Sequence, residues 1–231
     1  MDRSIKPLDV VYGSSLGVDS QRVLRNTYAL LALSMVPTVL GAWLGVATGF
    51  SFFAGSPLMG FVLFMAIAFG FFFGIEKFKN SGVGVLLLLG FTFFMGLMLS
   101  RLIGFVLGFK NGTSLVMTAF GGTAAVFFTM ASLATVIKRD LSSMGKFLVV
   151  GAVILMVAGI ANIFLQSSTL MLTMLVMSLA IFSAFMLYDI KRVVDGGETN
   201  YISATLAIYL DVYNVFQSLL SLLGIFGGDR E

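Results

Sequence analysis

Two aspartates near the end of the chain have the positions best suited to chemistry. Asp189 lies in the segment FMLYDIKRVV and Asp211 in AIYLDVYNVF, and both segments are otherwise strongly apolar. A carboxylate inside a segment that can span a bilayer costs on the order of 3 kcal/mol, so such residues usually have a function. Two carboxyl groups that meet in a medium of low dielectric cannot both ionise cheaply, and they titrate as one unit. The pair therefore predicts a pH-sensitive element.

Helix geometry allows the two carboxyl groups to meet. The short connector with the sequence GGETNY makes the two segments antiparallel neighbours. If the first helix ends near Asp195, Asp189 lies about 9 Å from that end, at about 1.5 Å per residue. If the second begins near Ile202, Asp211 lies about 13–14 Å into it. Both carboxyl groups are then at similar depth.

Polar residues gather on the same side of the last helix as Asp211. At about 100° per residue they fall within an arc of about 120°. The members of this polar arc are Ser203, Asn214, Gln217, Ser218 and Ser221. Such a face points into a helix bundle or a water-filled cavity rather than to lipid. We therefore expect Asn214, Ser218 and Ser221 to line a pore or polar interior, and the last helix to be central.

A purely structural alternative exists for each aspartate. Asp189 is followed at once by Lys191 and Arg192, and either cation can pair with a carboxylate. The alternative is stronger for Asp189 than for Asp211, which lies deeper and within the polar arc. As ligands for a divalent cation, Asp189 and Asp211 would make at most a weak calcium site, because calcium prefers six to eight oxygen ligands.

Composition identifies the class of protein that carries the pair. The 231 residues are 58% hydrophobic and only 11% charged, with a mean hydropathy of +1.03. Soluble domains have roughly 45–50% apolar and 25% charged residues. The chain contains neither cysteine nor histidine. It offers no nucleophile–base arrangement, so we expect an all-α integral membrane protein that is not an enzyme and needs no cofactor. The small net charge of +3 gives no indication of nucleic-acid binding.

Seven apolar segments are long enough to span a bilayer, which takes about 20 residues. They run roughly over Thr27–Gly49, Pro57–Ile75, Gly82–Ser100, Thr113–Ile137, Lys146–Gln166, Thr169–Val194 and Ile202–Phe226. Residues 1–26 form a polar segment before the first of them, and residues 27–231 form the transmembrane domain. If residues 1–26 are a flexible strand, they can reach the pore of a protease.

Basic residues predict the orientation. Eleven of the 14 lysines and arginines fall on the side of the N-terminus, and three fall on the other. Basic residues gather on the cytoplasmic side of membrane proteins. We therefore expect a cytoplasmic N-terminus and, with seven helices, a C-terminus on the outer side.

Small residues recur at helical spacing in two kinds of pattern. Three glycine pairs have GxxxG spacing, and they are Gly41 and Gly45, Gly70 and Gly74, and Gly104 and Gly108. The fourth segment carries a continuous small face, made of Thr118, Gly122, Ala125, Thr129 and Ser132. We expect these faces to pack within the bundle, because small residues let membrane helices approach closely. A dimer interface or a pore wall is the alternative.

Several motifs resemble those of the Bax inhibitor-1 family. They are the YD at Tyr188–Asp189, the stretch YLDVYNVFQSLLSLLGIFG at Tyr209–Gly227 and the KRDLS at Lys138–Ser142. The resemblance covers nearly the whole chain. It implies seven helices, with the last enclosed by six others, and an aspartate pair that gates a calcium leak with pH. Asp189 and Asp211 occupy the two positions of that pair.

Two further features refine the resemblance. The stretches GGETNYISAT (Gly196–Thr205) and RVLRNTY (Arg22–Tyr28) resemble the bacterial branch that modulates FtsH, a membrane-bound AAA+ protease. That branch implies the bacterial inner membrane. In the family an arginine at the cytoplasmic end of the second helix partners the aspartate pair. This chain has Glu76-Lys77-Phe78-Lys79 at that place.

Overall fold

Seven helices make up the computed structural model, which describes residues 7–50 and 57–228, with side chains for 20–50 and 58–228. Each helix is long and apolar enough to cross a membrane, and the described residues form no strand. The helices are α1 (Pro7–Thr48), α2 (Pro57–Phe78), α3 (Gly82–Leu107), α4 (Gly112–Val136), α5 (Ser142–Leu165), α6 (Ser168–Val194) and α7 (Tyr201–Gly227). The predicted all-α membrane fold with seven spans is confirmed.

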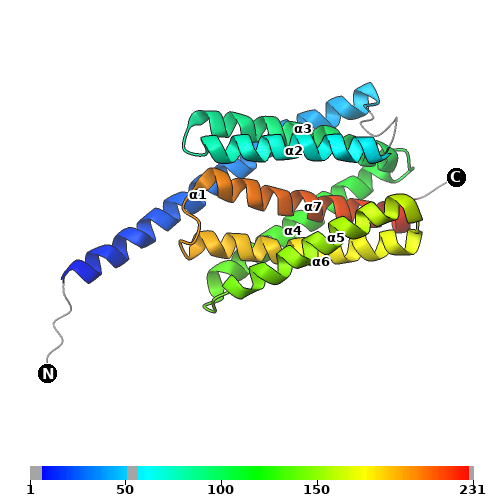
Figure 1. Ribbon diagram of the computed structural model, residues 1–231. Coiled ribbons are helices and arrows are strands. Elements are labelled where there is room, and N and C mark those ends of the chain that lie inside the picture. Colours follow the sequence, from blue (N-terminus) through cyan, green and yellow to red (C-terminus); the bar gives the residue numbers. More distant parts are fainter. Residues whose placement is uncertain (1–6, 51–56, 229–231) are drawn as a thin grey trace.

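The first helix is much longer than its apolar part. α1 begins at Pro7, whereas its stretch suited to a membrane begins at Ser20. The blue end of α1 projects beyond the other helices (Figure 1). Residues 7–26 are therefore helical. The expectation that they form a flexible strand is wrong for these residues. Extending an existing helix adds one hydrogen bond per residue, and proline is tolerated at its first position. Residues 1–6, with Arg3 and Lys6, lie outside the described residues.

The last helix lies among most of the others. α7 runs between the α2–α3 pair and the α5–α6 pair (Figure 1), and it packs against α1, α2, α3, α4 and α6. α5 packs chiefly against α6. Most of α7 is therefore covered by protein, and residues on several of its sides are buried, among them Ile208, Tyr209 and Leu220. α5 does not pack extensively against α7, so the enclosure of α7 by all six other helices stays a prediction.

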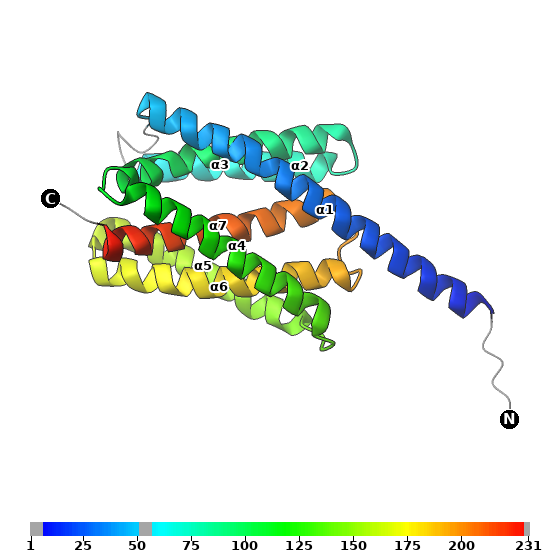
Figure 2. The same cartoon turned by 180° about the vertical axis from the view of Figure 1, so that it is seen from behind.

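Glycines bring α1 and α3 into close contact. A Cβ atom on Gly41 would overlap with the carbonyl oxygen of Phe93, and one on Gly96 with that of Thr38. A Cβ on Gly45 would overlap with the Ser100 side chain. In the reverse view, α1 crosses in front of α3 (Figure 2). The predicted packing role is confirmed for Gly41 and Gly45. It is wrong for Gly70, which is exposed and would place a Cβ atom in open space.

The small face of α4 behaves differently from the expectation. Thr118, Ala125, Thr129 and Ser132 are exposed on the surface of the bundle, and only Gly122 approaches α7, at Leu219. The hydroxyls of Thr118, Thr129 and Ser132 donate to carbonyls of their own helix. The expectation that this face packs within the bundle is wrong, because α4 turns the side with Leu115, Ala119 and Thr123 inward instead.

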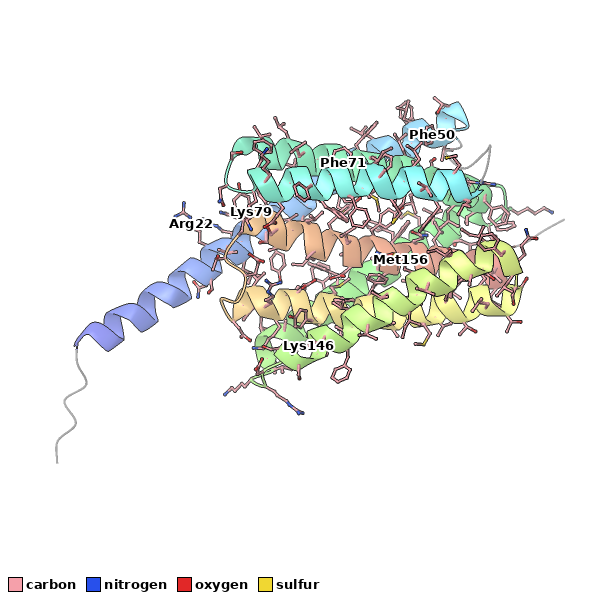
Figure 3. The ribbon with its side chains drawn as sticks, viewed as in Figure 1. Arg22, Phe50, Phe71, Lys79, Lys146 and Met156 are labelled. Atoms are coloured by element: carbon pink, nitrogen blue, oxygen red, sulfur yellow. The ribbon has the colours of Figure 1, made fainter. Side chains whose placement is uncertain are left out.

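Basic side chains separate between the two ends of the bundle. Arg22, Lys79 and Lys146 lie at one end, and Phe50 at the other (Figure 3). We call the first the basic end. The α2–α3 turn, the α4–α5 connector and the α6–α7 connector all lie there (Figure 1). α3 continues to Leu107, past its predicted end at Ser100, so Arg101 is an exposed residue within the helix. Arg230, near the C-terminus, lies outside the described residues.

Candidate functional site

The structure brings Asp189 and Asp211 together near the basic end. Their carboxyl groups lie within hydrogen-bonding reach of each other across the α6–α7 contact. Asp211 is 3% exposed, and Asp189 is partly buried. The Oδ2 atom of Asp211 is buried and has no hydrogen-bond partner among the described residues. Because a hydrogen bond between two carboxyl groups needs a proton on one of them, this geometry suits a pair that shares one proton.

The nearby cations pair with other carboxylates. The Lys191 Nζ atom lies 2.5 Å from Asp195 Oδ1, and the Arg192 Nη2 atom lies 3.3 Å from Glu198 Oε2. No ion pair joins Asp189 to either cation within the part of the chain that the structure describes. Arg192 is nevertheless near enough to act on Asp189 through its charge. The alternative in which Asp189 simply pairs with Lys191 or Arg192 therefore does not describe this structure.

A cavity of about 280 Å³ opens beside the pair, between α2, α6 and α7. Its charged lining consists of Glu76, Asp189, Arg192 and Glu198, and its remaining walls are largely apolar. Arg192 is the one cation in this lining. Glu76 accepts a hydrogen bond from Lys79, and its Oε2 atom accepts one from the Ser203 hydroxyl at 3.3 Å. The second helix thus presents a carboxylate to the site, where the family resemblance implied an arginine.

The α6–α7 connector links Arg192 to the second and third helices. Glu198 binds Arg192 through Oε2 and accepts from the Asn200 backbone N–H through Oε1, at 2.9 Å. Asn200 caps α7 by accepting from the backbone N–H groups of Ile202 and Ser203. Its amide also donates to Lys79 O at 3.0 Å, in the α2–α3 turn. One chain of polar contacts therefore runs from α6 through the connector to α2 and α3.

A glycine turn follows the end of α6. Gly196 has φ +76°, a left-handed conformation that costs glycine little. The backbone N–H of Gly197 then donates to Arg192 O at 2.8 Å, which closes the helix end. This turn brings Glu198 back toward Arg192.

The structure divides the polar arc of α7. Ser218 is buried and donates to the Ser178 hydroxyl of α6 at 3.0 Å. Asn214 is partly buried and donates to Leu210 O of its own helix at 2.8 Å, rather than to Asp211. Ser221 is partly buried, while Gln217 is exposed. The arc therefore meets α6 at Ser218 and α2 at Ser203, and its role as a pore lining stays a prediction.

Sequence reasoning missed three members of the site, which are Glu76, Arg192 and Glu198. The sequence showed Glu76 only as standing where the family has an arginine, and Arg192 only as a possible ion partner of Asp189. The available signal was spacing, because Arg192 follows Asp189 by three residues and shares its helix face. Glu198 carried no such signal, since a tight turn after α6 decides where it points.

The pair offers too few ligands for a tightly held metal ion. Among residues 7–50 and 57–228, no group of three or more aspartate, glutamate, cysteine or histidine side chains is arranged to hold one. Weak calcium binding by Asp189 and Asp211 stays a prediction, in which calcium is a transported ion.

Several bacterial proteins are similar to this chain over most of its length. The chain is 40% identical to an uncharacterized protein of Neisseria meningitidis serogroup A, over 92% of this chain and 94% of that protein. It is 36% identical to a membrane protein of Vibrio cholerae, over 92% and 93%. It is also 34% identical to the modulator of FtsH protease YccA of Escherichia coli K12, over 92% and 94%. Residues 20–228 match the family described as inhibitor of apoptosis-promoting Bax1, so the chain belongs to the Bax inhibitor-1 family.

Proposed function

We propose that this protein is a pH-sensitive calcium leak of the inner membrane, gated by Asp189 and Asp211. The observation that carries the proposal is the contact between the two carboxyl groups, one of them buried, across α6 and α7. The family resemblance supports the same reading, because these residues occupy the positions of its gating pair. An inner-membrane protein of Escherichia coli O6, YccA, is 34% identical to the chain, which supports the location.

The gate works through a shared proton. At low pH one proton lies between the carboxyl groups and holds α6 against α7. When the pH rises the proton leaves, and two like charges remain in a medium of low dielectric, where they repel strongly. Separation of the helices opens the basic end, and the carboxylates then offer oxygen ligands to calcium. Calcium flux therefore increases with pH.

Arg192 supplies the basic partner of the pair in this proposal. It lines the cavity with Asp189, and it is held by Glu198 rather than by the pair. A cation nearby favours the ionised carboxylates and hence the open state. Glu76 and Glu198 face the same cavity and oppose that effect, although Lys79 and Arg192 partly neutralise them.

Calcium flux into liposomes tests the gate. The protein and its Asp211→Asn, Asp189→Asn and double variants are reconstituted, and flux is followed from acidic to alkaline pH. Each single variant should flatten the pH dependence, since an amide still hydrogen-bonds a carboxylate but carries no charge. The double variant should add little more. Asp140→Asn serves as the control, because Asp140 is exposed and bonds only locally to Ser142. A double variant with the full pH-dependent flux would remove the pair from the mechanism.

A second function is restraint of the FtsH protease. The 34% identity to the modulator of FtsH protease YccA over 92% of this chain favours it. α1 offers a physical contact, because its first part projects beyond the bundle and is available to a partner (Figure 1).

Deletion of Met1–Gly17 tests the second function. This change shortens the projecting part of α1 and leaves the membrane-spanning stretch that begins at Ser20. Degradation of an FtsH substrate should lose its restraint in the deletion variant, while the thermal stability of the bundle is kept. The full-length double aspartate variant should retain the restraint, which separates the two functions. Undiminished restraint after the deletion would place the contact elsewhere, within the membrane.

A further inference from the structure

A second cavity lies on another side of Asp189, between α5 and α6. Its volume is about 580 Å³. The polar part of the lining consists of Ser142, Lys146, Tyr188, Asp189 and Arg192, and the apolar part includes Val149 and Phe185. Lys146 lies at the basic end (Figure 3). The cavity therefore combines a charged region near one end of the bundle with apolar walls along α5 and α6.

The charges that face this cavity are dominated by cations. Lys146 is exposed and forms no ion pair with a carboxylate within the described part of the chain. The side chain of Arg192 is 48% exposed, although Glu198 holds it from the other side. Asp189 is the one carboxylate in the lining, against the two cations Lys146 and Arg192.

Neighbouring acidic residues are engaged with other groups. Hydrogen bonds from the hydroxyl and backbone N–H of Ser142 hold the pKa of Asp140 below its usual value, so this carboxylate is engaged with Ser142 beside the start of α5. Asp195 pairs with Lys191. The attraction for an anion therefore comes from Lys146 and Arg192.

The cavity also borders the region where lipid lies. Among the described helices, α6 is the one against which α5 packs extensively. The other sides of α5 expose large apolar residues, among them Phe147, Val150 and Ile154. A molecule in this cavity can therefore keep an apolar tail in the bilayer while its polar part meets Lys146 and Arg192.

We propose that the α5–α6 cavity binds an anionic phospholipid. Its phosphate group is held by the Lys146 ammonium and the Arg192 guanidinium, and an acyl chain follows Val149 and Phe185. Basic pockets between transmembrane helices on the cytoplasmic side are suited to anionic headgroups. Arginine matches the geometry of phosphate oxygens, while lysine adds a point charge. The proposal does not depend on calcium conduction or on FtsH.

Native mass spectrometry of the full-length protein in neutral detergent tests the site. Phosphatidylglycerol and phosphatidylcholine of equal chain length are titrated, and bound lipid is counted. Lys146→Ala/Arg192→Ala should bind phosphatidylglycerol at least about tenfold more weakly, because each lost charge-assisted hydrogen bond contributes an amount of that order. The matched control is Lys138→Ala/Arg139→Ala, which removes the same charge from the same end outside the cavity and should bind as the unmodified protein does.

A third variant tests whether lipid binding needs the space of the cavity as well as its two positive charges. Val149→Trp fills the cavity from the α5 side, leaves both cations in place, and should also weaken phosphatidylglycerol binding. Thermal unfolding verifies that each variant is folded. The proposal is overturned if the cavity and control variants lose binding equally, or if phosphatidylcholine binds as well as phosphatidylglycerol. Equal competition by inorganic phosphate would overturn it too, since the cavity would then be an anion site without a lipid.

Discussion

The burial and the charges around a carboxyl pair determine the pH at which the pair loses its proton. Asp211 is buried on α7, and Asp189 reaches it from the rim of two cavities. Arg192 lines both cavities, and Glu198 holds it at 3.3 Å. In the proposed gate, the charge of this guanidinium acts on the pair in addition to the burial of the carboxyl groups.

Replacing Arg192 should move the pH at which calcium flux begins. Without its positive charge the ionised carboxylates are less favoured, so Arg192→Gln should shift the rise in flux toward higher pH, by up to about one pH unit. The measurement is flux into liposomes of neutral lipid, which keeps lipid binding out of the comparison. Arg139→Gln removes an equal charge from the α4–α5 connector and should leave the profile in place. An unchanged profile for Arg192→Gln would show that another group tunes the pair.

Helix packing in this bundle depends on which small residues meet a neighbour. On α1 and α3, glycines allow backbones to come so close that a methyl group would overlap with a carbonyl oxygen. On α4, an equally regular small face is exposed. Similar patterns thus have different roles, and the arrangement of the helices decides between them.

Gly96→Ala should destabilise the α1–α3 crossing. The new Cβ atom would overlap with the backbone at Thr38, and an overpacked contact of this kind costs about 1–3 kcal/mol. Gly70→Ala is the matched control, because Gly70 is exposed on α2 with nothing within 4 Å of a new Cβ atom. It should leave stability unchanged or raise it slightly, as alanine is the better helix former. Thermal unfolding in detergent measures both, and equal midpoints would contradict the expected role of the close crossing.

The whole molecule has two unlike ends. The candidate site, both cavities and the connectors rich in lysine and arginine lie toward the basic end (Figure 3). The projecting part of α1 leaves the bundle at that end as well (Figure 2). The proposed gate, lipid site and protease contact all lie at this end. All three would therefore be exposed to the same compartment.

The basic end should face the cytoplasm. A phosphatase fused after Glu231 should be active, because the enzyme folds only outside the cytoplasm and seven spans place the two termini on opposite sides. A fluorescent protein at the same place should stay dark. Fusions in the α4–α5 connector should give the opposite results. Fluorescence at the C-terminus would contradict the orientation that the eleven-to-three distribution of basic residues predicts.

Much of the architecture follows from the sequence alone. Apolar length determines seven helices, because every backbone polar group within a bilayer must be paired inside its own segment. The short connector makes α6 and α7 antiparallel neighbours, and equal depth then allows Asp189 and Asp211 to meet. These features depend on local composition and spacing, which the sequence provides without knowledge of the tertiary structure.

The tertiary structure decided what surrounds the pair. Lys191 and Arg192 are adjacent in sequence, yet one pairs with Asp195 and the other with Glu198, because successive helical residues point about 100° apart. Glu76 lines the first cavity from α2, and Asn200 ties the start of α7 to the α2–α3 turn that follows it. The exposed face of α4 and the cavity between α5 and α6 likewise depend on how helices distant in sequence rotate against one another, which no local pattern records.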